Sequence, residues 1–165
     1  MVYLGLGSNL GDRLEHLSQA VQLLDALPGS SVHRVSSVYE AEPVGFKEQD
    51  DFLNLALELR TELNPLPLFN ETKNIEKRLG RGNGERWHPR EIDIDILLYD
   101  EIIFRSERLF IPHREMLNRK FVLAPLSEIA GSAIHPIEKM DVRTLLERCK
   151  DTGRVAKTEF ELTHT

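Results

Sequence analysis

The chain has 165 residues, a length that suits one folded domain, and its 41% hydrophobic and 29% charged residues are typical of a globular protein. A formal net charge of −6 disfavours a general nucleic-acid binder or a protein that adheres to anionic membranes. The single cysteine, Cys149, excludes an internal disulfide and a cysteine zinc site, and no apolar run approaches the ~18 residues of a membrane span.

Hydrophobic periodicity predicts alternating strands and helices. In chain order, the predicted elements are a strand at 2–6, a helix at 14–27, strands at 31–40 and 52–59, a helix at 65–79 and a strand at 92–99. This βαββαβ order is that of a ferredoxin-like α+β fold, an antiparallel sheet with helices on one face. C-terminal additions are expected to follow: a strand within 102–111 and short helices near 114–118 and 142–149.

We therefore expect one cytoplasmic domain over residues 1–165, monomeric and without a nucleic-acid or membrane partner. The first residues lack the basic-then-apolar pattern of a signal peptide. The tail from about residue 150 is weakly patterned and expected to be prone to fraying.

The strand at 52–59 has the clearest pattern in the chain. Four leucines alternate with other residues, so a period of two places them on one face of the strand. The same period places Phe52 and Asn54 side by side on the opposite face. One aromatic ring and one amide could there address a flat heterocycle together.

Basic residues gather in two segments of this acidic chain. Residues 73–90 hold six basic against two acidic side chains, and residues 105–120 hold five against two. Arginine forks match phosphate oxygens in pairs, so the clustering indicates a localised anion site. The competing interpretation is that these are solvated faces of helices and loops.

A pair of carboxylates lies between the two basic segments. Asp93 and Asp95 stand two residues apart in a predicted strand, so both project from the same face. Adjacent carboxylates repel unless a cation compensates, and magnesium takes one or two carboxylates together with substrate phosphates. The alternative is two surface aspartates that each pair with an arginine. Carboxylates for magnesium beside arginines for phosphate describe a nucleotide phosphoryl-transfer site.

Neither common glycine-rich nucleotide motif is present. Nothing matches G-x-x-x-x-G-K-[ST], and the spacing of Gly5, Gly7 and Gly11 departs from the dinucleotide fingerprint. We interpret these glycines as a tight turn.

Several segments, in order from about residue 3 to about residue 137, resemble the 6-hydroxymethyl-7,8-dihydropterin pyrophosphokinase family. The most specific runs from Arg86 through Trp87, Pro89 and Arg90 to the two aspartates, and the others are residues 6–12, 42–45, 52–54, 111–113 and 118–121. The resemblance implies transfer of the β,γ-diphosphate of ATP to the hydroxymethyl group of a reduced pterin, with release of AMP, in folate synthesis.

The resemblance also implies roles for individual residues. Asp93 and Asp95 would bind two magnesium ions and, with Arg81 and Arg90, form the catalytic set. ATP contacts would come from Glu76, Arg81, Trp87, Arg90, Arg108, His113 and Arg119. Pterin contacts would come from Glu42, Val44, Phe52, Asn54 and Phe121, with the two phenylalanines sandwiching the ring.

Two positions depart from the family pattern. Asn83 stands where some members have a second arginine, and Arg114 stands where an aromatic residue is sometimes found. Neither change touches the two aspartates.

Two other functions compete with this one: a ferredoxin-like module that binds RNA on its sheet, and a metal-dependent phosphohydrolase that would use the same aspartates.

Overall fold

The computed structural model describes residues 1–43, 50–81 and 92–162, with only the backbone of Arg81 included. The strands are β1 (Val2–Ser8), β2 (Ser30–Val35), β3 (Tyr39–Ala41), β4 (Phe52–Thr61), β5 (Asp93–Tyr99), β6 (Phe104–Arg105), β7 (Phe110–Ile111) and β8 (Val155–Lys157). The helices are α1 (Arg13–Asp25), α2 (Pro65–Glu76), α3 (Lys120–Ala130) and α4 (Val142–Arg148), with short turns η1 (Lys77–Arg81) and η2 (Met116–Asn118). None of these helices is long and apolar enough to cross a membrane.

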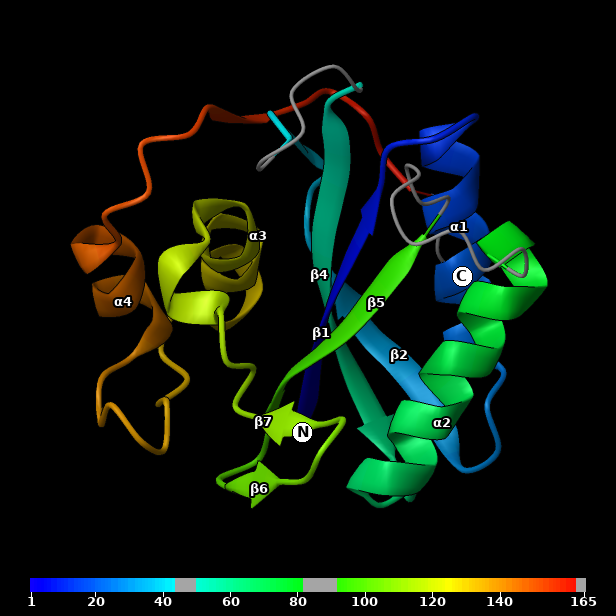
Figure 1. The fold of residues 1–165 in the computed structure, drawn as a ribbon, viewed down its shortest axis with the longest axis horizontal. Helices are drawn as coiled ribbons and strands as arrows, with labels where there is room; N and C mark the ends of the chain where they lie inside the picture. The colour runs from blue at the N-terminus through cyan, green and yellow to red at the C-terminus, as the bar shows by residue number, and fades with distance from the viewer. Residues whose placement is uncertain (44–49, 82–91, 163–165) are drawn as a thin grey trace.

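An antiparallel sheet forms the centre of the molecule, as the alternation of elements predicts (Figure 1). Its main path runs β5-β1-β4-β3-β8, and β2 also pairs with β4. The predicted strand at 31–40 is divided between β2 and β3, which both pair with β4. Ser36 lies at the break, where its Oγ accepts a hydrogen bond from the Ala56 amide at 2.9 Å.

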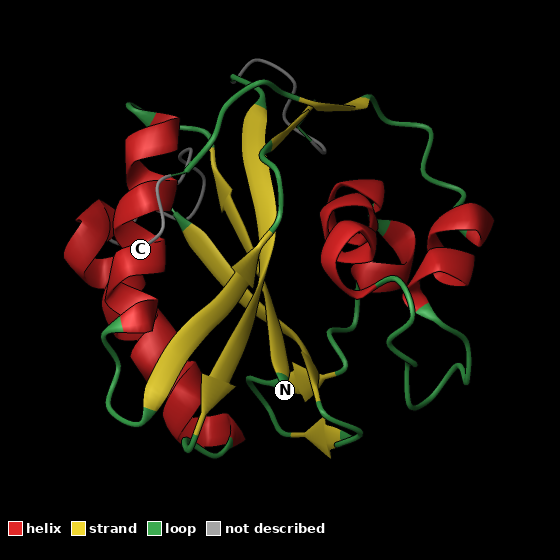
Figure 2. Ribbon diagram, turned by 180° about the vertical axis from the view of Figure 1, so that it is seen from behind, coloured by secondary structure: helices red, strands yellow, loops and turns green. Residues whose placement is uncertain are grey.

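Two hydrophobic cores lie on opposite sides of this sheet. The two helices of the predicted βαββαβ core, α1 and α2, share one face as expected, and the C-terminal helices α3 and α4 cover the other face (Figure 2). The leucines of β4 face α1 and α2, as their alternation predicts. Ala56, Leu97 and Leu98 face the other way, against α3 and α4. This second face is apolar and would cost free energy if left in water, so further helices cover it.

Helix α3 is absent from the elements predicted from sequence. Pro125 lies inside it, where proline removes a backbone hydrogen bond and ordinarily indicates a break. The helix nevertheless buries Val122, Leu123, Leu126 and Ile129 against the sheet. Tertiary packing therefore outweighs the local cost of the proline.

The remaining predicted additions are present in altered form. The strand expected within 102–111 is the small β6–β7 ladder, and the helix expected near 114–118 is the single turn η2. The helix expected near 142–149 is α4. Residues 155–157 of the tail form β8, which pairs with β3 and extends the sheet.

Truncation of a β4 leucine should measure how much the core between the sheet and helices α1 and α2 contributes to the free energy of unfolding. Leu57 is fully buried, so Leu57→Ala should lower the free energy of unfolding by about 2–5 kcal/mol in urea denaturation. Leu66 is 46% exposed on α2, and the matched Leu66→Ala should change it by less than about 0.5 kcal/mol. Equal losses in the two variants would contradict the described core.

Candidate active site

Two glycines of β1 form the floor of the site. Gly7 pairs with Asn54 on β4 and with Asp93 on β5, and Gly5 pairs in the same way with Ala56 and Asp95. A Cβ placed on Gly7 would lie 2.8 Å from Asn54 Oδ1. Gly5 and Gly7 therefore belong to a strand and not to a tight turn, which corrects the sequence-based interpretation for these two, whereas Gly11, with φ +65°, lies in the bend before α1. Gly5 and Gly7 leave room for the side chains on either side.

An apolar cavity of about 210 Å³ opens above this floor, and residues of the sheet and of α3 line it. The lining includes Glu42, Phe52 and Asn54 from the β3–β4 side, and Arg119, Phe121 and Val122 from the start of α3. The structure thus brings the predicted pair Phe52 and Phe121 to one cavity. Of the predicted pterin contacts, only Val44 lies outside the described residues.

Asn54 presents an unused hydrogen-bond donor to this cavity. The residue is 5% exposed, and no described residue accepts a hydrogen bond from its Nδ2. A buried donor left without a partner costs about 1–3 kcal/mol. The arrangement therefore favours a ligand that carries a hydrogen-bond acceptor at this point.

A second, polar cavity of about 670 Å³ adjoins the first. Four cations line it, Lys73, Arg108, Arg114 and Arg119, together with the acids Asp93, Asp95 and Glu115. The surplus of positive charge suits an anion with several negative charges.

Each of these four cations lies over an aromatic ring, and Arg119 Cζ is 5.8 Å from the centre of the Phe121 ring. Lys73 Nζ and Arg108 Cζ each lie 5.2 Å from the centre of the Phe69 ring, and Arg114 Cζ lies 4.4 Å from that of Phe110. Such contacts stabilise a cation over the face of a ring without neutralising its charge. Sequence reasoning included Lys73 and Arg114 in the two basic segments but assigned neither a role at the site, although the four-residue spacing of Phe69 and Lys73 in a helix was available as a signal.

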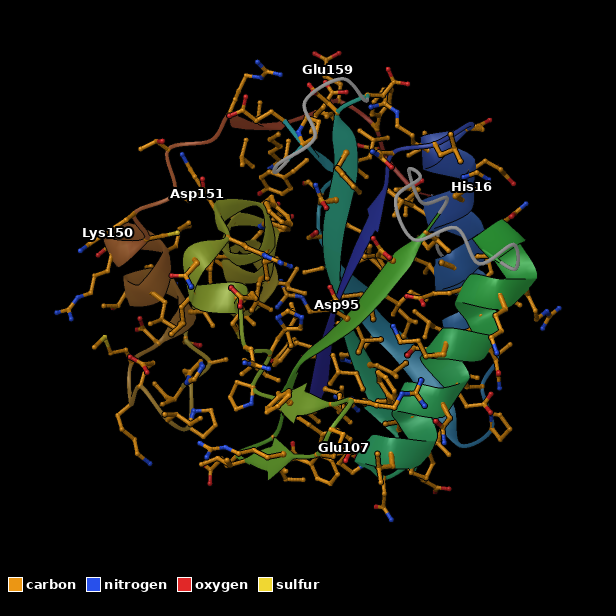
Figure 3. The ribbon with its side chains drawn as sticks, in the orientation of Figure 1. His16, Asp95, Glu107, Lys150, Asp151 and Glu159 are labelled. Carbon is orange, nitrogen blue, oxygen red and sulfur yellow. The ribbon has the colours of Figure 1, made fainter. Side chains whose placement is uncertain are left out.

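The two cavities meet at Asp93, Asp95 and Arg119, which line both. Asp93 and Asp95 stand two residues apart on β5, the outer strand of the sheet, so they project from the same face of that strand. Figure 3 labels Asp95 on this strand. The Asp95 side chain is 40% exposed. Two neighbouring carboxylates therefore stand at the boundary between an apolar and a cationic hollow.

His113 stands beside Asp95 in the polar cavity. Its Nε2 lies 3.8 Å from Asp95 Oδ1, and its Nδ1 accepts a hydrogen bond from the Glu115 amide at 3.2 Å. Burial lowers the pKa of the imidazole, although the Asp95 carboxylate opposes that change. The neutral ring then carries its proton on Nε2, because Nδ1 is an acceptor, and it can donate a hydrogen bond into the cavity.

Glu76 lies behind the site and lines neither cavity. It is 1% exposed, and its Oε2 accepts a hydrogen bond at 2.7 Å from the amide of Ile94, the residue between the two aspartates. Lys73 Nζ lies 3.2 Å from its other oxygen. This geometry indicates that Glu76 helps to fix the start of β5.

Four residues singled out from the sequence have side chains outside the described residues: Arg81, Asn83, Trp87 and Arg90.

A model of the family described as 7,8-dihydro-6-hydroxymethylpterin-pyrophosphokinase (HPPK) matches residues 3–131. The chain belongs to the HPPK family. It is 49% identical to the 2-amino-4-hydroxy-6-hydroxymethyldihydropteridine pyrophosphokinase of Bacillus subtilis, over 78% of this chain and 77% of that one. The enzyme of the same name from Aquifex aeolicus is 42% identical, over 86% of this chain and 88% of that one.

Solved structures share the HPPK fold. A Plasmodium falciparum HPPK-DHPS crystal structure matches with a TM-score of 0.73 at 17% identity and covers 89% of this chain. The match takes up 45% of that longer chain, so this chain spans less than half of it. The HPPK family match ends at residue 131, and α4 and β8 follow it.

The floor of the HPPK site should be sensitive to a single methyl group. Gly7→Ala places that methyl against Asn54 Oδ1, so we expect a loss of about 1–3 kcal/mol in the free energy of unfolding. In Gly5→Ala the methyl would meet Leu97 Cδ1 at 3.3 Å, at the end of a flexible side chain, and the loss should be smaller. Urea denaturation compares the two, and a smaller loss for Gly7→Ala would refute the steric argument.

Proposed function

We propose that this chain transfers the diphosphate group of ATP to the hydroxymethyl group of 6-hydroxymethyl-7,8-dihydropterin and releases AMP. Membership of the HPPK family supports the reaction class. The observation that carries the proposal is the meeting of an apolar and a cationic cavity at Asp93, Asp95 and Arg119. A flat, weakly charged acceptor and a polyphosphate donor can approach one another at such a boundary.

The apolar cavity is proposed to hold the pterin between Phe52 and Phe121. Aromatic stacking contributes about 0.5–1.5 kcal/mol beyond the area that is buried. The free Nδ2 of Asn54 can donate to an acceptor on the polar edge of the ring. Glu42 and Val44 complete the proposed pterin contacts.

The polar cavity is proposed to hold ATP. Arg108, His113 and Arg119 line it and are the proposed phosphate or nucleotide contacts, and Lys73 and Arg114 add charge around them. Arg81, Trp87 and Arg90 remain predicted contacts, with Arg81 and Arg90 also in the proposed catalytic set. Glu76 is proposed to act at the ATP side through β5 rather than by touching the nucleotide.

Asp93 and Asp95 are the proposed magnesium ligands, and two ions are proposed. Two carboxylates on one strand face, beside cations that suit phosphate, form the oxygen-rich donor set that magnesium takes together with phosphates. When bound, magnesium would supply charge neutralisation for the polyphosphate.

The proposed transfer is an in-line displacement at the β-phosphorus. The pterin hydroxyl oxygen forms the new bond to phosphorus, the bond to the oxygen bridging the α- and β-phosphorus breaks, and AMP leaves with that electron pair. The hydroxyl proton passes to solvent. Arg119 would stabilise charge that develops at the boundary, and neutral His113 would donate from Nε2 to a phosphate oxygen. The chain's contribution is positioning and charge compensation rather than covalent catalysis.

Two competing functions have less support. An RNA-binding module would need an open sheet face, but helices pack against both faces of the sheet in the described structure (Figures 1 and 2). A phosphohydrolase would consume ATP without pterin and release phosphate rather than AMP.

The cellular setting is likewise proposed. We propose a cytoplasmic, monomeric enzyme whose partners are its small substrates and not nucleic acid or membranes. A single cysteine suits a reducing compartment, and a net charge of −6 disfavours nucleic acid and anionic membranes as partners.

Asp95→Ala should abolish transfer while the fold survives, because it removes a metal ligand that packs in neither hydrophobic core. Loss of a group that only supports a metal ligand lowers metal affinity or activity about 10–100-fold, so loss of the ligand itself should lower activity at least about 100-fold. The rate of AMP formation from ATP, magnesium and the reduced pterin measures this loss of activity. Glu107→Gln removes a charge on the β6–β7 hairpin and is the control (Figure 3). Wild-type formation of phosphate instead of AMP, or near-normal turnover by Asp95→Ala, would refute the assignment.

Phe121→Ala should weaken pterin binding selectively. Loss of a stacking wall should raise the pterin dissociation constant about tenfold, whereas that of a non-hydrolysable ATP analogue should change less than about twofold. Calorimetric titration separates the two constants. Phe160→Ala truncates an exposed ring in the tail and controls for loss of aromatic surface. Unchanged pterin affinity in Phe121→Ala would remove this residue from the proposed sandwich.

A further inference from the structure

The chain beyond α4 crosses from one layer of the molecule to the other. It leaves α4, passes over the end of the sheet near the start of α3, and forms β8 beside β3 (Figures 1 and 2). Leu162 then packs against the core on the side of α1 and α2. This path lies outside residues 3–131, which the family model matches. On its way, the segment contacts both walls of the apolar cavity.

Asp151 fastens the segment to the α3 wall. Its Oδ2 accepts a hydrogen bond at 3.0 Å from the Lys120 amide, at the first position of α3 (Figure 3). Arg119, the residue at the helix N-cap, makes no side-chain capping bond of its own. Asp151 therefore supplies from the tail the cap that α3 otherwise lacks. The capped turn carries Arg119 and Phe121, which both line the apolar cavity.

Arg154 fastens the same segment to the sheet wall. Its amide donates to Glu42 Oε1 at 3.0 Å, and its carbonyl accepts from the Glu42 amide at 3.2 Å. Its guanidinium donates to Asp51 Oδ2 at 2.7 Å, directly before Phe52 in the chain. Glu42 and Phe52 line the apolar cavity opposite α3.

The segment is itself held at both ends of this span. Asp151 Oδ1 accepts from the Gly153 amide at 2.8 Å, so both carboxylate oxygens of Asp151 are engaged. A Cβ on Gly153 would lie 3.0 Å from Asp151 Oδ1 and 3.3 Å from Glu42 Oε1, so the segment lies close to both fastening points. Thr158 bonds Val38 O through its amide and its hydroxyl.

We propose that residues 150–158 form a strap that sets the separation of the two walls of the apolar cavity, with Asp151 and Arg154 as positioning residues for its ligand. The proposal rests on the proposed function, which places the pterin in that cavity. Loss of the cap lets the first turn of α3 fray, and this turn carries one of the two proposed stacking rings. The strap thus acts on pterin affinity through Phe121 and Arg119 rather than by contact with the pterin.

The test compares caps of two neighbouring helices in the full-length protein. Asp151 caps α3, and Asp141 caps α4 through a 2.8 Å bond from the Thr144 amide. No residue of α4 lines the apolar cavity. Asp151→Ala should raise the dissociation constant of 6-hydroxymethyl-7,8-dihydropterin about fivefold, measured by calorimetry with a non-hydrolysable ATP analogue and magnesium. Asp141→Ala should lower the melting temperature to a similar extent and leave that constant within about twofold.

Rescue and a second variant make the outcome decisive. Asp151→Asn keeps an oxygen acceptor and should restore most of the pterin affinity. If Asp151→Ala does not fold, Gly153→Ala, which pushes the segment away from Asp151 and Glu42, should weaken pterin binding in the same direction. Equal pterin affinity in Asp151→Ala and Asp141→Ala would overturn the proposed strap. Where Gly153→Ala is used instead, unaltered pterin affinity in that variant would overturn it. Absence of pterin binding by the wild-type protein overturns the proposed function instead.

Discussion

The register of β1 between its two neighbours is the constraint on which the site depends. Gly7 pairs with Asn54 on one side and with Asp93 on the other, so an amide from β4 and a carboxylate from β5 flank one position that has no side chain. Any other residue at Gly7 would meet Asn54 at 2.8 Å. A slip of one residue would turn these groups to the opposite face, where the leucines of β4 form the core. Core packing and site geometry are therefore fixed by the same strand pairings.

Charge is distributed across this floor in a way that separates two kinds of ligand. On the apolar side, helix α3 supplies Phe121 and the sheet supplies Phe52. On the polar side, Arg108 and Arg114 rest on aromatic rings, which orient them and leave their charge available, while Lys73 also forms an ion pair with Glu76. The surplus of positive charge in the polar cavity offsets the repulsion between the two aspartates at the boundary. The boundary carboxylates and the cations of the polar cavity therefore balance one another's charge.

The parts of the molecule that sequence predicts are those encoded locally. Alternation places the leucines of β4 on one face and Phe52 with Asn54 on the other, and spacing places Asp93 and Asp95 together. What it misses depends on neighbours that are distant in the chain. The role of Gly7 as open floor follows from Asn54 across the ladder, and α3 forms around Pro125 because an apolar sheet face lies beneath it. The burial of Glu76 behind β5 likewise depends on how α2 packs, which its own sequence does not specify.

The second wall of the apolar cavity, at the start of α3, depends on the C-terminal tail. Phe52 is the first residue of β4 and pairs with Ala41 of β3, whereas Phe121 sits in the first turn of a helix whose own N-cap residue makes no side-chain cap. Such a turn is the most easily frayed part of a helix. The sheet wall lies within residues 3–131, which the family model matches, whereas the cap on the helical wall comes from Asp151, beyond those residues. Relatives that differ in this tail can therefore share the chemistry of the two aspartates and still differ in how firmly the helical wall closes on the ring.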